Sequence, residues 1–296
     1  MQKSYLIIRI LGNDLQGLHG QNQTLTNLEF TLKNEHNFDD TDKIFVLNRI
    51  VDLNKKQNII DMLNTYNVKY IDNPFLINDF NKIPRIIINH SKYKKYNTKY
   101  IAKLLYYYNL YLINNNGARN FCIDYGKKNK YKWSFVFDSN SFLTKNSFES
   151  IINTINVKTE YLIIPQKRLK DGNLSNNAIL TIDEQKIIEL PIQEPQIAFK
   201  NTSIHKFNPS IPYGLCPKAE LLRALGVKGK WSHWNDNKRF LNINDRNFND
   251  VKCQVVSFVI RLNPGNPNNN SHNNAKARWV GLYLLVEKIY LHQNKT

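Results

Sequence analysis

The stretch YLIIRILGND, residues 5 to 14, joins a run of apolar and β-branched residues to an abrupt polar stop. The run predicts a buried strand, and the Gly-Asn-Asp group that ends it predicts a turn. Leucines at helical spacing follow in residues 25 to 32, and Thr24 or Thr26 is placed to cap that helix. The beginning of the chain therefore predicts a strand, a loop and a helix in succession.

The same alternation continues downstream. The sequence predicts a second strand in KIFVLNRIV (residues 43 to 51), a second helix in NKKQNIIDMLNTYN (54 to 67) and a third strand in VKYIDNPF (68 to 75). Strands that alternate with helices form a parallel sheet, because the chain must cross back over the sheet between neighbouring strands. This part of the chain is typical of one half of a nucleotide-binding α/β layer.

Beyond this half the pattern is weaker. WSFVFD (133 to 138) and EYLIIPQ (160 to 166) predict two further strands, and NAILTIDEQKIIEL (177 to 190) predicts a hairpin. Residues 263 to 278 form a polar, low-complexity stretch that predicts a mobile loop. The apolar segment from 279 to 293 predicts a closing helix.

The expected fold class is α/β, with a mostly parallel sheet flanked by helices. We expect a single domain over residues 1 to 296, divided into a nucleotide-binding half of about 1 to 150 and an elaborated half of about 151 to 296. A domain boundary near residue 150 is the alternative.

The composition excludes several classes of protein. The chain has 296 residues, 42% of them hydrophobic, which predicts a globular protein with a large core. No window is apolar enough to span a membrane and the first residues lack a cleavable signal pattern, so we expect a soluble, cytoplasmic protein. The three cysteines have neither the spacing of a disulfide framework nor that of a zinc site, so we expect neither.

The chain is strongly basic. Its 41 lysines and arginines against 24 aspartates and glutamates give 41 − 24 = +17. The lysines are scattered among asparagines and isoleucines, a bias that an AT-rich genome produces by itself, and no nucleic-acid recognition motif is present. We therefore expect no nucleic-acid partner, whereas the charge suits a nucleotide diphosphate or an acidic glycan.

A single carboxylate ends the fourth expected strand. In an open α/β sheet, ligands bind beyond the carboxyl ends of the strands, and Asp138 follows WSFVF at such an end. A carboxylate there can hold a divalent cation, Mn²⁺ or Mg²⁺, that neutralises the phosphates of a nucleotide sugar, and the amide oxygen of Asn140 can ligate the same metal. The alternative is that Asp138 only caps the following turn.

Residues 116 to 144, NGARNFCIDYGKKNKYKWSFVFDSNSFLT, resemble the central signature of GT-A fold glycosyltransferases of the family 2 type. In that signature a small-residue turn and an Arg-Asn pair begin a helix, and an aromatic strand ends in a D-x-D motif. Arg119, Asn120 and Asp138 occupy matching positions. Two other regions, residues 8 to 30 with 45 to 52, and residues 194 to 207 followed by 213 to 231, resemble a bacterial and giant-virus group of glycosyltransferases.

The resemblance implies transfer of a hexose, with glucose as the first candidate, from a UDP-sugar to a hydroxyl acceptor. The acceptor would be a glycan or a glycoprotein, such as a viral surface fibre or a collagen-like protein. This sequence has D-S-N where the family has D-x-D, so either Asn140 completes a weaker metal site or basic residues neutralise the diphosphate instead. A non-catalytic protein that binds a nucleotide sugar or a glycan through the same fold is the alternative function.

The resemblance also assigns nucleotide contacts. It implies that Arg119 and Asn120 reach the diphosphate or the sugar, and the fixed fork of donors on Arg119 suits that role. It places the nucleoside at the end of the first strand, which directs attention to three side chains there: Arg9, Asn13 and Asp14. Asn48 and Arg49, at the tip of the second strand, form a similar pair. The alternative for these residues is an ordinary role in turns and surface ion pairs.

The acceptor side is expected in the second half of the chain. An inverting transfer needs a carboxylate that removes the proton of the acceptor hydroxyl, and Glu194 and Glu220 are the candidates. Glu194 is preferred because it stands in an otherwise uncharged stretch, whereas Glu220 fits the exposed face of a helix. Trp231 and Trp234 either stack on a sugar ring or pack in the core.

Overall fold

The structure, a computed structural model, describes residues 2–85, 98–168, 176–182, 184–190, 192–229, 246–262 and 271–293. Its strands are β1 (Tyr5–Leu11), β2 (Thr41–Asn48), β3 (Lys69–Asn73), β4 (Trp133–Asp138), β5 (Ser141–Phe142), β6 (Tyr161–Lys167), β7 (Ile192–Lys200), β8 (Cys253–Val255) and β9 (Val259–Arg261). They form one sheet in the order β3-β2-β1-β4-β7-β6-β9-β5, and β8 pairs with β6.

The sheet changes direction at β7. The strands β3, β2, β1 and β4 are neighbours and run parallel, so that their carboxyl ends share one edge. β7 runs antiparallel to both β4 and β6, which joins the strands of the second half of the chain to those of the first. The predicted α/β fold with a mostly parallel sheet flanked by helices is confirmed.

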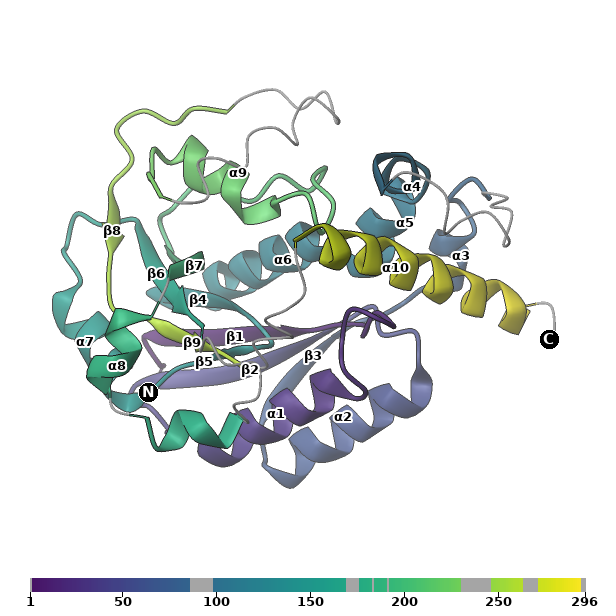
Figure 1. The fold of residues 1–296 in the computed structure, drawn as a ribbon. Helices are drawn as coiled ribbons and strands as arrows, with labels where there is room; N and C mark the ends of the chain where they lie inside the picture. The colour runs from purple at the N-terminus through teal and green to yellow at the C-terminus, as the bar shows by residue number, and fades with distance from the viewer. Residues whose placement is uncertain are drawn as a thin grey trace.

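Helices lie on both faces of the sheet (Figure 1). They are α1 (Gln23–Asn34), α2 (Leu53–Thr65), α3 (Ile77–Phe80), α4 (Thr98–Leu104), α5 (Tyr106–Tyr108), α6 (Asn115–Lys128), α7 (Lys145–Thr154), α8 (Glu184–Glu189), α9 (Pro217–Ala224) and α10 (Ser271–Gln293), with a π-helical turn η2 (Asn109–Ile113) and a 3-10 turn η3 (Asn176–Leu180). None of the described helices is both long and apolar enough to cross a membrane.

Alternating side chains of the strands supply two core layers. On one face, Leu11 and Phe45 pack against Leu28 of α1 and Ile59 of α2. On the other face, a larger cluster joins the strands to α6 and α9; it includes Ile8, Val46, Cys122 and Leu221. Figure 1 shows α10 crossing near the carboxyl ends of the first three strands, where it packs against α4. This arrangement leaves the carboxyl edge of the sheet surrounded by α6, α9 and α10.

The hairpin predicted for residues 177 to 190 is wrong. The described residues of this segment form η3 and α8. Ile179 and Ile187 both reach a small core cluster with Phe142 of β5. Burial of these two side chains in one cluster therefore favours the helical turns over the hairpin strands that the weak alternating pattern predicted.

Two further boundaries differ from their predictions. β2 ends at Asn48 rather than at residue 51, because Arg49 has a positive φ of 49°, which interrupts a strand. The last helix begins at Ser271 rather than at residue 279, so the end of the predicted polar loop is helical. The rest of that loop, residues 263 to 270, lies outside the described residues.

A buried ion pair joins β1 to the end of α1. Arg9 is 1% exposed; its guanidinium pairs with Glu35, and its Nε donates to the carbonyl oxygen of Ser141 at 3.1 Å. The Glu35 carboxylate accepts from the backbone N–H of Leu143 at 3.0 Å and lies 3.2 Å from Nζ of Lys43. This cluster fixes the end of α1 and the segment after β4 relative to β1.

Replacing Glu35 with alanine would leave Arg9 buried without its carboxylate. We expect Glu35→Ala to lower the free energy of unfolding by roughly 3 to 5 kcal/mol, the usual cost of an uncompensated buried charge. Urea unfolding followed by circular dichroism measures it. Glu149→Ala removes an acid from an exposed pair with Lys145 and should cost less than about 0.5 kcal/mol. Equal effects of the two substitutions would contradict the role of this cluster.

Candidate active site

The Asp138 carboxylate lies at the carboxyl end of β4 and meets two cationic side chains. Its Oδ1 accepts from Nη2 of Arg119 at 2.8 Å, and its Oδ2 accepts from Nζ of Lys218 at 2.9 Å. The side chains of Arg119 and Lys218 are 3% and 4% exposed, whereas that of Asp138 is 31% exposed. One partly exposed carboxylate therefore joins β4 to α6 and α9.

The surroundings of Asp138 keep it ionised. Burial would raise the pKa of this carboxyl, but the charges of Lys218 and Arg119, and their hydrogen bonds, outweigh burial and hold the pKa well below its usual range. Gln196 of β7 adds a third contact: its Nε2 lies 3.3 Å from Oδ2, and its Oε1 lies 3.4 Å from the backbone nitrogen of Asp138. At neutral pH the site therefore contains an anion fixed between two cations.

The side chains around Asp138 do not suit the divalent metal site predicted for Asp138 and Asn140. Both carboxylate oxygens already have cationic partners, so a metal ion would have to displace at least one of them. Hard divalent cations take about six oxygen ligands. No group of three or more His, Cys, Asp or Glu side chains that could hold a metal occurs in the part of the chain that the structure describes. The backbone carbonyl oxygen of Asn140, as distinct from its side-chain amide, accepts from the N–H of Leu262 at 2.7 Å.

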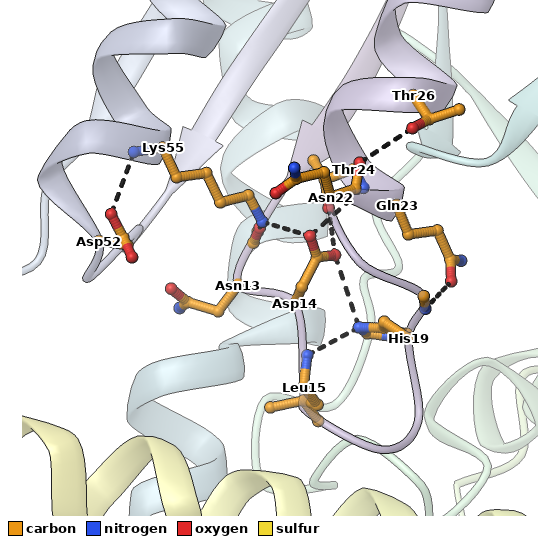
Figure 2. Close-up of polar contacts among 12 residues, drawn as sticks. Asn13, Asp14, Leu15, His19, Asn22, Gln23, Thr24, Thr26, Asp52 and Lys55 are labelled. Carbon is orange, nitrogen blue, oxygen red and sulfur yellow. Dashed lines mark hydrogen bonds and ion pairs between the residues drawn. The ribbon is translucent and has the colours of Figure 1, made fainter.

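A second carboxylate lies in the turn after β1 (Figure 2). Asp14 accepts from the hydroxyl of Thr24 at 2.6 Å and from Nζ of Lys55 at 2.8 Å. Thr24 thus binds Asp14 instead of capping α1, whose N-cap is Asn22 with a φ of 54° and no side-chain cap. The side chain of Asp14 is 21% exposed, so a ligand can still reach it.

His19 lies beside Asp14 in the same loop (Figure 2). Its Nδ1 accepts from the backbone N–H of Leu15 at 2.8 Å and lies 3.6 Å from Oδ1 of Asp14. Burial lowers the pKa of His19, and the charge of Asp14 acts against this change. Three basic side chains lower the pKa of His19 further: Lys55, Arg278 and Arg261. An imidazole whose Nδ1 accepts a hydrogen bond in its neutral form carries its proton on Nε2, from which it can donate to a ligand.

Two of these basic side chains come from the end of the chain. Arg261 ends β9 and pairs in register with Ser141, just after the tip of β4. The guanidinium of Arg278, on α10, lies 4.7 Å from the ring centroid of Tyr213, with Nη1 at 3.5 Å from the carbonyl oxygen of Gly214. Within the described residues, the Nε atoms of Arg261 and Arg278 are buried and have no hydrogen-bond partner.

Two glycines allow α10 to approach the site. A Cβ at Gly281 would lie 2.7 Å from the carbonyl oxygen of Gln16 and 2.9 Å from Cβ of Leu15. A Cβ at Gly214, whose φ is 95°, would lie 2.5 Å from Cδ of Arg278. Any other residue at either position would push α10 or its arginine away.

Several residues that were predicted to bind the nucleotide have hydrogen-bond partners within the fold. Asn13 donates to the carbonyl oxygen of Arg49 at 2.8 Å and accepts from the N–H of Val51 at 2.9 Å. Asn48 is 2% exposed and donates to a carbonyl oxygen of η2 at 2.8 Å. Arg49 donates to the carbonyl oxygen of Tyr111 at 2.7 Å and lies over that ring. These contacts join the tips of β1 and β2 to η2.

Arg9 and Asn120 also have partners within the fold. Arg9 is enclosed with Glu35, and Asn120 exchanges two hydrogen bonds with the backbone of Phe207, at 2.9 and 3.0 Å. Asp14, Arg119 and Asp138 are the predicted nucleotide-binding residues whose side chains converge on the carboxyl edge of the sheet. Of these, Asp14 and Asp138 stay partly exposed.

The two candidate general bases have different surroundings. Glu220 pairs with Arg246 through both carboxylate oxygens, at 2.6 and 2.5 Å, and is 7% exposed. Glu194 has a buried Oε1 without a hydrogen-bond partner in the described segments. Continuing the antiparallel register of β7 along β4 places Glu194 at the same edge of the sheet as Asp138. Glu194 is therefore the better placed of the two acids to take up a proton.

Four residues of the site were not predicted from the sequence: Lys218, Gln196, Arg261 and Arg278. Gln196 and Lys218 lie in stretches that resemble the glycosyltransferase group but were given no role, and the two arginines are far from the predicted site along the chain. One alternative considered for the sequence pointed toward such residues: basic side chains, rather than a metal ion, would neutralise the diphosphate. The two tryptophans of residues 230 to 236, predicted either to stack on a sugar or to pack in the core, lie outside the described residues.

The sequence matches no family model and no curated protein. Several solved structures are similar in overall arrangement. The 4-diphosphocytidyl-2C-methyl-D-erythritol synthase of Anaerococcus prevotii is 14% identical, with 96% of this chain and 100% of that one covered and a TM-score of 0.36. A mannosyltransferase of Pyrobaculum calidifontis, in complex with GDP-Man and Mn²⁺, is 8% identical, with 87% and 57% covered and a TM-score of 0.37.

Mouse xyloside xylosyltransferase 1 is also similar, at 8% identity, with 94% of this chain and 82% of that one covered and a TM-score of 0.30. Identities and TM-scores at this level assign no function to the chain.

Lys218→Met tests the electrostatics of the site, because it removes one cation from Asp138 and keeps a side chain of similar length. We expect the variant to lose roughly 2 kcal/mol of unfolding free energy at pH 7. The pKa of Asp138 is lower in the folded protein than in the unfolded chain, where it is about 4, so the ionised carboxylate stabilises the fold above that pH. This stabilisation decreases as the pH falls below about 4 toward the folded-state pKa. The difference between the two proteins should therefore shrink below about pH 4.

Urea unfolding at pH 7 and pH 3 measures this difference. Lys288→Met serves as the control, because Lys288 pairs with Asp52 at 2.9 Å on the surface, where ion pairs contribute little. A loss of stability in Lys218→Met that stays the same at both pH values would contradict the assignment.

Proposed function

We propose that this protein is a glycosyltransferase that transfers a hexose from a UDP-sugar to a hydroxyl group on a glycan or a protein. The observation that carries the proposal is the Asp138 carboxylate held between Arg119 and Lys218 at the carboxyl end of a parallel strand. Open α/β sheets bind nucleotides at this edge. UDP-glucose is the first donor to test, and the resemblance of residues 116 to 144 to the family 2 signature supports the choice of reaction.

The nucleoside would lie at the turn after β1. Asp14 is oriented there by Thr24 and Lys55, and it retains exposed surface with which to accept from a base N–H or a ribose hydroxyl. Asn13 is committed to backbone groups near Arg49, so its part in the site is to hold the turn in place.

The diphosphate would lie between this turn and the tip of β4. Arg119 and Lys218 together exceed the charge of Asp138 by one, so the group as a whole attracts an anion. Fixed positive groups are most useful where negative charge develops in the transition state. In sugar transfer that charge develops on the phosphate oxygen that leaves the sugar.

The transfer forms one bond and breaks one. The acceptor oxygen bonds to the anomeric carbon as the bond from that carbon to the phosphate oxygen breaks, and the electron pair of the broken bond stays on the diphosphate. In an inverting transfer, Glu194 would take the proton of the acceptor hydroxyl. Its buried Oε1 without a partner among the described residues is consistent with a group kept available for a ligand.

Donor hydrolysis and transfer assays with a panel of sugar nucleotides, led by UDP-glucose, test the proposal. We expect Asp138→Asn to lower kcat by at least about a hundredfold, because Arg119 and Lys218 lose the anion that positions them at the developing charge. Glu194→Gln should lower transfer and leave nucleotide affinity unchanged. Asp72→Asn, which alters an exposed pair with Lys56, is the matched control and should retain full activity.

Thermal unfolding of each variant separates lost activity from lost structure. An Asp138→Asn variant that is as active as the wild-type protein would contradict the assignment of the site. Nucleotide binding without turnover of any donor would favour the non-catalytic alternative.

A further inference from the structure

Two arginines near the tip of β4 have unused donors. The Nε atoms of Arg261 and Arg278 are buried and have no hydrogen-bond partner in the residues described by the structure. A buried donor without a partner costs free energy, so such groups call for an explanation such as a missing ligand. Nη1 of Arg278 has one long contact, at 3.5 Å, to a carbonyl oxygen.

These arginines flank the proposed diphosphate position from two sides. Arg261 stands beside Ser141 in the sheet, three residues after Asp138. Arg278 reaches the site from α10, which packs on the loop after β1 through Gly281. The charges of both arginines also lower the pKa of His19 in that loop.

The charges at this edge do not cancel. Asp14 is balanced by Lys55, and His19 is neutral when its Nδ1 accepts from the backbone. The remaining charged groups are Arg119, Lys218, Arg261 and Arg278 against Asp138 and Glu194, which gives 4 − 2 = +2. Arg168, which follows β6 beside β9, adds further positive charge next to Arg261.

We propose that Arg261 and Arg278 bind the diphosphate of the donor directly and take the place of a divalent metal ion. This inference rests on the proposed function and deepens it. Each phosphate of a sugar nucleotide carries one negative charge, and cleavage of the sugar–phosphate bond adds another on the leaving oxygen. Protein cations already present can neutralise all of this charge, because a guanidinium binds phosphate oxygens with two parallel N–H donors.

The same arrangement explains why Asp138 has no second acid beside it. In this site Asp138 positions Lys218 and Arg119 rather than ligating a metal, so an amide at Asn140 needs to supply no charge. A metal ion placed between Asp138 and the diphosphate would add positive charge to a region that already has an excess of it.

Isothermal titration calorimetry of the full chain with UDP, GDP and inorganic pyrophosphate tests the inference, each in EDTA and in Mn²⁺. We expect binding in EDTA, with a Kd that Mn²⁺ changes less than about threefold. Arg261→Gln and Arg278→Gln should each weaken binding at least about tenfold, as loss of a charge-assisted pair does. Arg261→Lys should recover part of the loss, because it restores the charge without the two parallel donors.

Arg85→Gln is the matched control. Arg85 stacks on Tyr290, which lies twelve residues after Arg278 on α10 and so roughly 18 Å farther along the helix. This variant should bind as the wild-type protein does. Thermal unfolding confirms that each variant is folded before it is titrated.

The outcomes separate the inference from the proposed function. Binding that appears only in Mn²⁺, or binding in EDTA that both glutamine variants retain in full, would overturn the metal-free site and leave the proposed function standing. Failure to bind any of the nucleotides or pyrophosphate in either condition would overturn both.

Discussion

The ion pairs of Asp138 with Arg119 and Lys218 are the interaction on which the rest of the site depends. They join three segments that are distant in sequence: the end of β4, the middle of α6 and the first turn of α9. Each of the two cations is almost fully buried, and a buried cation is stable only when a carboxylate stays beside it. The site therefore keeps Asp138 ionised and keeps its two partners aimed at one place.

The carboxyl edge of the sheet thus has more positive than negative side chains. Asp14 and Asp138 at this edge each have a lysine as a direct partner, and two arginines have buried donors without a partner in the described part of the chain. A metal site needs several free oxygen ligands, whereas the described residues of this edge have one unpaired carboxylate oxygen, on Glu194, beside the two unpaired N–H donors. This difference favours direct contact between the protein cations and the diphosphate that we propose as the ligand.

The sequence predicted the parallel half of the fold because apolar strands and amphipathic helices alternate there with clear turn signals. It also placed Asp138 and Arg119 at the edge of the sheet. It could not reveal that Asn13, Asn48 and Arg49 have hydrogen-bond partners within the fold, because those partners come from η2, the N-cap of α6 and the tips of neighbouring strands. Nor could it find Arg261 and Arg278, which only the pairing of β9 with β5 and the packing of α10 bring to the site.

A crystal structure of the protein with UDP, determined once from crystals grown in EDTA and once in Mn²⁺, tests this account most directly. The account predicts the same pose in both: phosphate oxygens on the guanidinium groups of Arg261 and Arg278, with Asp138 still paired to Lys218. A manganese ion between Asp138 and the phosphates, with Lys218 displaced, would contradict it.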